Sequence, residues 1–368
     1  MKKQGKLLKT AKATLSFILV SVSAMCVLQR LPECFGSQNP AALVAAAFTL
    51  TDGEYRLESD KKSEKSTEPT DESETKPNED STETASPKIR DKTGYYDSYA
   101  EHEGEEKYSI EEKNISGGAT EVSNCYIKNK KGLDLDFEAI LSDKLTFSVK
   151  MNTDSPQVLI YHTHTSEAYM DEDVDYFYES FYSRTQNSDF NVVGVGEAIA
   201  ETLNKKGIKT LHDKTQHDYP EYTGSYTRAA KTINSYLKKY PSIKIVLDLH
   251  RDAVSSGDSD KVKLVSKIDG RKAAQVMLVM GSQSGSVTNF PNWQENLKLA
   301  FKLQQALEVK YPSLARPLSL VSKNYNESLT KGSMLIEFGT DANSMDEVKY
   351  SAELVGDALA SVLNTLKE

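Results

Sequence analysis

The sequence predicts an α/β domain with a mostly parallel sheet flanked by helices, preceded by an N-terminal membrane anchor and a disordered acidic linker. From Gln157 onward, short aliphatic runs alternate with longer amphipathic segments, which is typical of strands that alternate with helices. The run Ile243–Leu249 is too apolar to face water on either side, as expected for a strand covered by helices on both faces.

Hydrophobic spacing assigns the elements of this domain in order. The helix expected over Asn191–Lys205 carries aliphatic residues at helical spacing on one face, and Gly207 ends it. Further helices are expected at Ser225–Lys238, Asn292–Lys310 and Met345–Leu366, and strands at Val158–Tyr161, Ile208–Leu211, Ile243–Leu249, Ala274–Met280 and Met334–Phe338.

Composition divides the 368 residues into three parts. Residues 1–35 are the expected anchor, 36–120 the disordered linker and 125–368 the catalytic domain. The stretch from Glu54 to Glu112 is dominated by Glu, Asp, Lys, Ser and Thr, so it cannot bury enough apolar surface to offset the entropy cost of ordering.

The N-terminus places the protein at a membrane. Five lysines, the last of them Lys12, precede an apolar run from Ala13 to Leu28. The positive-inside rule then puts the N-terminus in the cytoplasm and the catalytic domain outside, as a single-pass protein of the cell membrane. An uncleaved anchor is favoured over a cleaved signal peptide, because the small residues Ser21–Ser23 lie inside the apolar run.

Charge and cysteine content exclude some classes of protein. The net charge of -9 and the lack of a basic face argue against nucleic acid as a partner. Three cysteines do not form a disulfide framework, so they do not decide the compartment.

Three predicted strands end in residues that can bind a metal. Val158–Tyr161 leads into His162, His164 and Glu167, Ile243–Leu249 leads into His250, and Met334–Ile336 leads into Glu337. Ligands of open α/β sheets bind beyond the carboxyl ends of the strands, so these groups are expected at one edge. Histidine nitrogens and a carboxylate, with one position left for water, suit a catalytic Zn²⁺.

The spacing assigns a role to each of these groups. His164 and Glu167 have the His-x-x-Glu spacing that brings both side chains to one ion, and His250 supplies the third ligand. Glu337 is the expected catalytic carboxylate, which takes the proton of the attacking water and passes it to the leaving nitrogen. One of His162 and His164 is expected to lie behind the ligands, and the sequence leaves open which one touches the ion.

A second group of residues is expected around the metal. Asp248 can orient a ligand, and an alternative role as a strand-end cap is about equally supported. Arg228 and Arg251 can pair with carboxylates of a substrate, since a guanidinium recognises such groups with two hydrogen bonds, and Asp252 lies beside them in the sequence.

These segments resemble the stage II sporulation protein P family, cell-wall hydrolases of endospore formers. The matching segments are Val158–Tyr169, Tyr222–Arg228, Asp248–Asp252 and Leu335–Asn343. More distantly the pattern is similar to zinc-dependent N-acetylmuramoyl-L-alanine amidases and to zinc carboxypeptidases.

The resemblance implies cleavage of the amide between muramic acid and the stem peptide of peptidoglycan, with endopeptidase activity on cross-links. It also implies action at the septum during sporulation and engulfment, with stage II sporulation proteins D and M as partners. The broader amidase family takes its carboxylate ligand from just before the helix after the first strand, where this chain reads Gln186–Asn191 without a glutamate. Glu167 is therefore the expected ligand, with Asp189 and Glu179 as substitutes.

Two alternatives fit the same residues. A zinc carboxypeptidase that trims stem peptides also uses His-x-x-Glu with a later histidine and a late glutamate. A non-catalytic scaffold, anchored in the membrane and bound to the wall, would retain the fold with a vestigial metal site.

Overall fold

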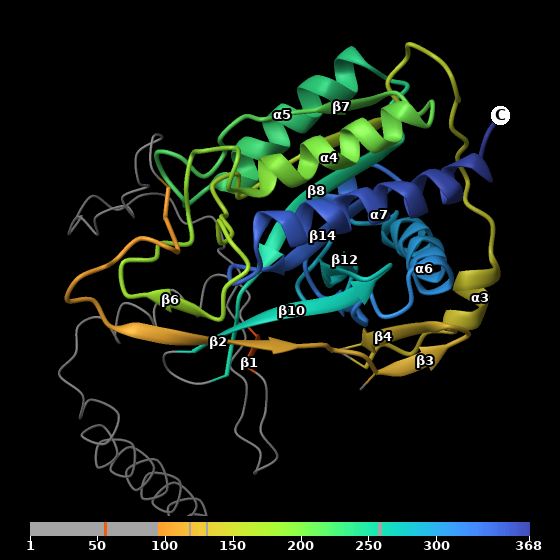
Figure 1. Cartoon of the computed structure of the whole chain (residues 1–368). Coiled ribbons are helices and arrows are strands. Elements are labelled where there is room, and N and C mark those ends of the chain that lie inside the picture. The colour runs from red at the N-terminus through yellow and green to blue at the C-terminus, as the bar shows by residue number, and fades with distance from the viewer. Residues whose placement is uncertain (1–54, 57–94, 118, 130–131, 257–259) are drawn as a thin grey trace, which may run out of the picture. The chain divides into compact units, whose positions relative to one another are not determined.

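The computed structural model describes residues 55–56 and 95–368, except for 118, 130–131 and 257–259 (Figure 1). The predicted anchor and most of the predicted linker lie outside the described residues. Within the described part of the chain, no helix combines the length and apolar character needed to cross a membrane.

A large mixed sheet forms the centre of the described chain. Its strand order is β3-β4-β13-β12-β14-β8-β5-β7. Only β3 with β4 and β12 with β14 pair antiparallel, so the prediction of a mostly parallel sheet is confirmed for the described residues. The bounds are β3 Thr120–Val122, β4 Cys125–Asn129, β5 Val158–Tyr161, β7 Thr210–His212, β8 Ile245–Asp252, β12 Val276–Gly281, β13 Leu318–Val321 and β14 Ser333–Thr340.

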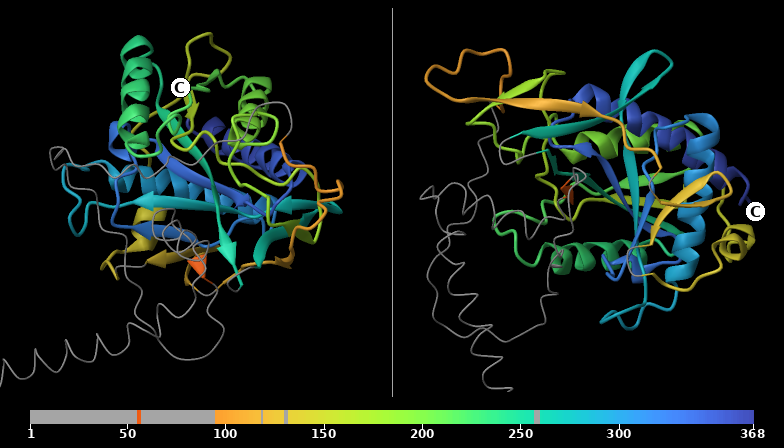
Figure 2. Two further views of the ribbon diagram at one scale, coloured as in Figure 1. Left: turned by 90° about the vertical axis from the view of Figure 1, so that its left-hand side faces the viewer. Right: turned by 90° about the horizontal axis from the view of Figure 1, so that it is seen from below.

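Helices cover both faces of this sheet. The helices are α3 Phe137–Ser142, α4 Val192–Lys205, α5 Ser225–Lys239, α6 Trp293–Lys310 and α7 Met345–Asn364, with a 3-10 turn at Glu327–Leu329. Each face of the sheet has its own hydrophobic core, and successive residues of β5 point into different ones. Ile160 belongs to the core formed with α4, α6 and α7, whereas Leu159 belongs to the core that contains Ile233 of α5. The left view of Figure 2 shows α5 and α4 standing on opposite sides of the strands.

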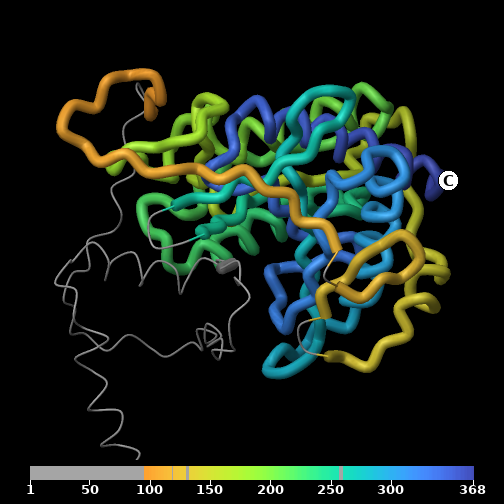
Figure 3. The backbone as a smooth tube through the Cα atoms, turned by 60° about the horizontal axis from the view of Figure 1, so that its bottom comes forward, coloured from red at the N-terminus to blue at the C-terminus, as the bar shows by residue number. Residues whose placement is uncertain are grey.

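A second sheet has the order β1-β9-β10-β2-β6, and β11 pairs with β10. Its strands are β1 Tyr55–Arg56, β2 Lys107–Lys113, β6 Tyr176–Tyr178, β9 Val254–Ser255, β10 Lys261–Ile268 and β11 Arg271–Ala274. Figure 3 shows β2, in orange, running beside β10.

Strand β2 corrects one expectation, because it lies within residues 36–120, the range predicted to be a disordered linker. Its charged residues find partners on neighbouring strands: Glu112 lies 2.8 Å from Lys272 and 4.0 Å from Lys263. Ile110 is buried in a small aromatic core with Tyr96 and Phe177. The sequence signal of disorder was therefore wrong for this segment, since charges that look solvated in the sequence are paired across strands.

The fold brings three strand ends to one edge of the central sheet. Strands β5, β8 and β14 are neighbours and run parallel, so their carboxyl ends meet. In register, Glu337 of β14 lies opposite His250 of β8. Alternate residues of a strand point to the same face, so His250 lies on the same face of β8 as Val246. Val246 packs with Ile233 of α5, so the His250 side chain lies on the face of the sheet that α5 covers.

Candidate metal centre

The two histidines that follow β5 lie in different environments. Both ring nitrogens of His162 have a hydrogen-bond partner. Its Nδ1 lies 3.1 Å from the carbonyl oxygen of Leu249, and its Nε2 lies 2.8 Å from Nε2 of His212. His164 is also buried, yet its Nδ1 has no hydrogen-bond partner. Strand β5 ends at Tyr161 and a turn follows, so the two histidines do not share a face as strand alternation would require. These contacts favour His164 over His162 as the ligand.

His250 lies between two carboxylates. Its Nδ1 is 3.4 Å from an oxygen of Glu167, and its Nε2 is 3.0 Å from Oδ1 of Asp248. Burial lowers the pKa of His250, but the two carboxylates outweigh it and hold the pKa well above the usual range. Asp248 is fixed in turn by Thr163, whose N–H and hydroxyl donate to it at 2.8 and 2.7 Å. Asp248 is thus placed to fix the orientation of the His250 ring through the ring nitrogen that faces away from Glu167.

Glu167 is buried beside His250. Its carboxylate also accepts the backbone N–H of Arg251 at 3.1 Å. Burial raises its pKa, but the neighbouring His250, His164 and Arg251 charges outweigh this effect and lower the pKa overall. Glu167 is therefore ionised, as a carboxylate ligand must be.

Glu337 lies on the neighbouring strand, with carboxylate oxygen Oε2 buried and without a hydrogen-bond partner. Burial raises the pKa of Glu337 to about 8; His250 lowers it, whereas Asp252 and Glu167 raise it. A carboxyl group with a pKa near neutrality can both accept and return a proton at physiological pH. The pKa of Glu337 therefore suits the acid–base role expected from the sequence, and that role stays a prediction.

The donor types suit Zn²⁺, since imidazole nitrogens and a carboxylate oxygen are the ligands of catalytic zinc sites. The His164 and His250 rings are 5.3 Å apart between centroids, and Glu167 touches His250. As the side chains stand, no group of three His, Cys, Asp or Glu residues among the described residues converges tightly enough to hold an ion. Glu167 is instead ion-paired with His250, and His164 Nδ1 is a buried nitrogen without a partner, which a cation would satisfy.

The predicted arginines bind backbone carbonyls. Arg251 donates to the carbonyl oxygens of Ala168 and Ser183 at 3.0 and 2.9 Å. Arg228 donates from Nε to the carbonyl of His217 at 2.6 Å, and also to those of Glu221 and Thr223. These bonds hold the loops around the site, so a role of either arginine in substrate binding stays a prediction.

Asp252 forms a buried ion pair with Arg316 at 2.8 Å. Both side chains are buried, and both charges act on the pKa of Glu337. Asp252 raises the pKa of Glu337 and Arg316 lowers it, so the pair shapes the electrostatic environment of Glu337.

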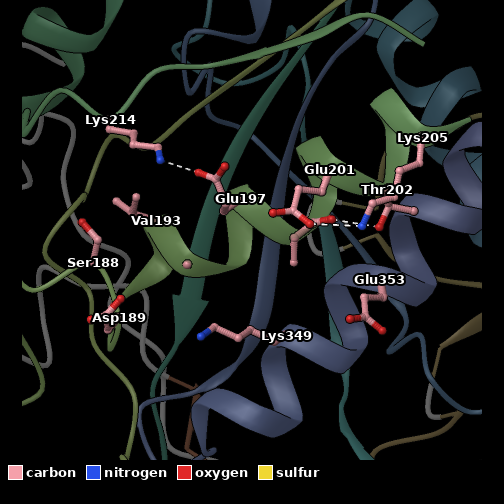
Figure 4. Close-up of a pocket in the computed structure, with 12 residues that line it drawn as sticks. Ser188, Asp189, Val193, Glu197, Glu201, Thr202, Lys205, Lys214, Lys349 and Glu353 are labelled. Atoms are coloured by element: carbon pink, nitrogen blue, oxygen red, sulfur yellow. Dashed lines mark hydrogen bonds and ion pairs between the residues drawn. The ribbon is translucent and has the colours of Figure 1, made fainter. Parts of the chain in front are cut away.

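The two substitute ligands lie away from His250. Glu179 is exposed just beyond β6. Asp189 lines an open groove between α4 and α7, which Lys349 and Glu353 also line (Figure 4). The groove carries charges of both signs, including the Lys214–Glu197 and Lys205–Glu201 ion pairs. Of the three candidates for the carboxylate ligand, Glu167 is the one that contacts His250.

Sequence reasoning missed the residues that surround the ligands. Tyr222 stacks on the His164 ring, His212 contacts His162, and Arg316 pairs with Asp252. Tyr222 lies in a segment that the family resemblance had already marked, although nothing in its spacing pointed to His164. His212 and Arg316 carry no local motif, so no sequence signal could have identified them.

Comparison with known proteins gives one family. The model of the family described as Stage II sporulation protein P matches residues 36–360. Stage II sporulation protein P of Bacillus subtilis (strain 168) is 27% identical over 227 residues, which cover 57% of this chain and 51% of the relative. The chain thus spans about half the length of the curated relative it matches.

Solved amidase structures give weaker matches. The CwlD amidase from Clostridioides difficile, solved in complex with the GerS lipoprotein, is 10% identical, with a TM-score of 0.36 over 57% of this chain and 98% of that one. The N-acetylmuramyl-L-alanine amidase Ami1 from Mycobacterium smegmatis is 12% identical, with a TM-score of 0.35 over 58% of this chain and 99% of that one.

Proposed function

Because this chain belongs to the stage II sporulation protein P family, we propose that it is a zinc-dependent peptidoglycan hydrolase of sporulation. The bond it cuts is the amide between muramic acid and the stem peptide, and cross-links between stem peptides are a second substrate. The observation that carries the proposal is the meeting of His164, Glu167, His250 and Glu337 at one sheet edge.

His164, Glu167 and His250 would hold the zinc ion. When bound, zinc supplies Lewis acidity toward the scissile carbonyl and lowers the pKa of a bound water to about 7. Asp248 orients the His250 ring, at 3.0 Å from its Nε2. Glu337 takes the proton of the attacking water and delivers it to the amide nitrogen as the carbon–nitrogen bond breaks.

The place of action follows from the N-terminal sequence and the family. The lysine cluster and apolar run of residues 1–35 are proposed to anchor the protein in the cell membrane, with the catalytic domain on the outer, septal side. Stage II sporulation proteins D and M are the proposed partners at the septum.

Digestion of purified sacculi tests the proposal. The full-length protein should bind one zinc ion and release stem peptides with free amino termini from intact glycan strands. Chelation should stop the release and added zinc should restore it. Elemental analysis measures the zinc, and mass spectrometry identifies the products.

Three outcomes would contradict the proposal. Stem peptides that lose only their terminal residues would indicate a carboxypeptidase. Binding to sacculi without any release would indicate a scaffold. Full activity after removal of all metal would contradict zinc dependence.

A further inference from the structure

Two histidines hydrogen-bond to each other at the ends of neighbouring strands. His212 ends β7 and His162 directly follows β5, and their Nε2 atoms lie 2.8 Å apart. The ring centroids are 5.1 Å apart and the ring planes cross at 72°, so the rings meet nitrogen to nitrogen and not face to face. A proton on one of these nitrogens therefore points along the lone pair of the other.

The other nitrogen of His162 decides which ring donates this proton. Nδ1 of His162 lies 3.1 Å from the carbonyl oxygen of Leu249, which can only accept, so Nδ1 carries a proton. A charge on this buried ring would have no anionic hydrogen-bond partner, so His162 is neutral and its Nε2 is a bare acceptor. His212 therefore donates its Nε2–H. This assignment holds whether or not Nδ1 of His212, which lies 3.5 Å from the Glu197 carboxylate, is also protonated.

Helix α4 leaves room for this pair at Gly196. A Cβ atom at that position would lie 2.5 Å from Nε2 of His212 and 2.9 Å from Nε2 of His162. Glycine weakens the interior of a helix, and the backbone of Gly196 does not adopt a positive φ that would require it. The close approach of the two rings accounts for the glycine. The contact also places the pair on the α4 side of the sheet, behind the face on which His250 lies.

The two hydrogen bonds cross three neighbouring strand ends, since β7, β5 and β8 are adjacent in the sheet. They run from His212 to His162 and from His162 to Leu249, and we call this chain of bonds the histidine strap. His162 lies two residues before His164, and Leu249 directly precedes His250. The histidine strap thus joins the two backbone segments that carry the histidines of the proposed zinc site.

We infer that His212 is a positioning residue of the proposed zinc site, whose Nε2–H bond to His162 holds the turn of His164 in place beside the strand of His250. The inference rests on the proposed function, because the relative placement of these two histidines matters to a metal only if both bind it.

Zinc affinity of the full-length protein tests the inference, measured by competition with a chromophoric chelator. His212→Met removes the donor and retains a long side chain, so it should weaken zinc binding by roughly 10-fold, the lower end of the effect of losing an outer partner of a metal site. His212→Gln is the matched control. Its side chain is as long as that of Met and its amide can donate an N–H to Nε2 of His162, so it should bind zinc as the parent does.

The proton positions supply a second readout, which needs no variant. In metal-free protein labelled with ¹⁵N-histidine, long-range ¹H–¹⁵N spectra should show His162 protonated on Nδ1 and His212 protonated on Nε2. A proton on Nε2 of His162 would overturn the inference, even if His212→Met failed to fold. Equal zinc affinity of His212→Met and the parent would overturn it while leaving the proposed function intact, and so would equal weakening in His212→Met and His212→Gln. A parent protein that binds no zinc would overturn both.

Discussion

Glu337→Gln is expected to slow stem-peptide release by about 10²- to 10⁴-fold, the range for loss of a general acid–base residue, without loss of zinc. The amide of Gln fills the same volume but cannot take a proton from water. Glu337 is not among the proposed ligands, so the metal content should stay at one ion per chain. The measurements are initial rates on purified sacculi and elemental analysis of the same protein samples.

Glu327 provides a matched control for this substitution. It is also a buried glutamate, and burial raises its pKa well above the usual range. It accepts the backbone N–H of Gly281 at 2.9 Å, which a Gln oxygen can also do. Glu327→Gln should therefore retain the parent rate. If Glu337→Gln digested sacculi as fast as the parent, the assignment of the acid–base residue would be wrong.

Asp218→Ala is expected to lower the free energy of unfolding by about 3–5 kcal/mol, the usual cost of breaking a buried ion pair. The Arg184 and Asp218 side chains are 7% and 0% exposed and lie 3.3 Å apart. Removal of the carboxylate also takes an acceptor from the backbone N–H of Ser166. Urea denaturation followed by circular dichroism measures the change.

An exposed ion pair of similar length serves as the control. Lys205 and Glu201 lie 3.2 Å apart on α4, and both side chains are more than half exposed. Glu201→Ala should cost less than about 1 kcal/mol, because water already screens this pair. Equal losses in the two variants would show that burial does not set the strength of the Arg184–Asp218 pair.

The sequence predicted those parts of the fold whose signal is local. The aliphatic run Val158–Tyr161 is strand β5 with the same bounds, and the expected helix over Asn191–Lys205 is α4 with Asn191 as its N-cap. Apolar spacing within one segment is enough to identify such elements. The residues His164, His250 and Glu337 came together because parallel strands place their carboxyl ends at one edge.

Features set by distant partners could not be predicted. Strand β10 contains three lysines among its eight residues, yet Lys263 is buried beside Asp173. The contact of Tyr222 with His164 joins residues 58 positions apart in the chain. In both cases the environment of the residue depends on a segment whose position becomes known only when the chain has folded.

The pairing of β2 with β10 has a practical consequence for any fragment of this protein. A fragment that begins at Cys125 keeps all four proposed site residues but lacks β2, which lies between β10 and β6. It would leave an open strand edge on β10, and open edges of this kind invite chains to join through their backbones. A fragment that begins before Tyr95 retains both the strand and the aromatic residues beneath it. Such a fragment is the better starting point for purifying the enzyme without its N-terminal segment.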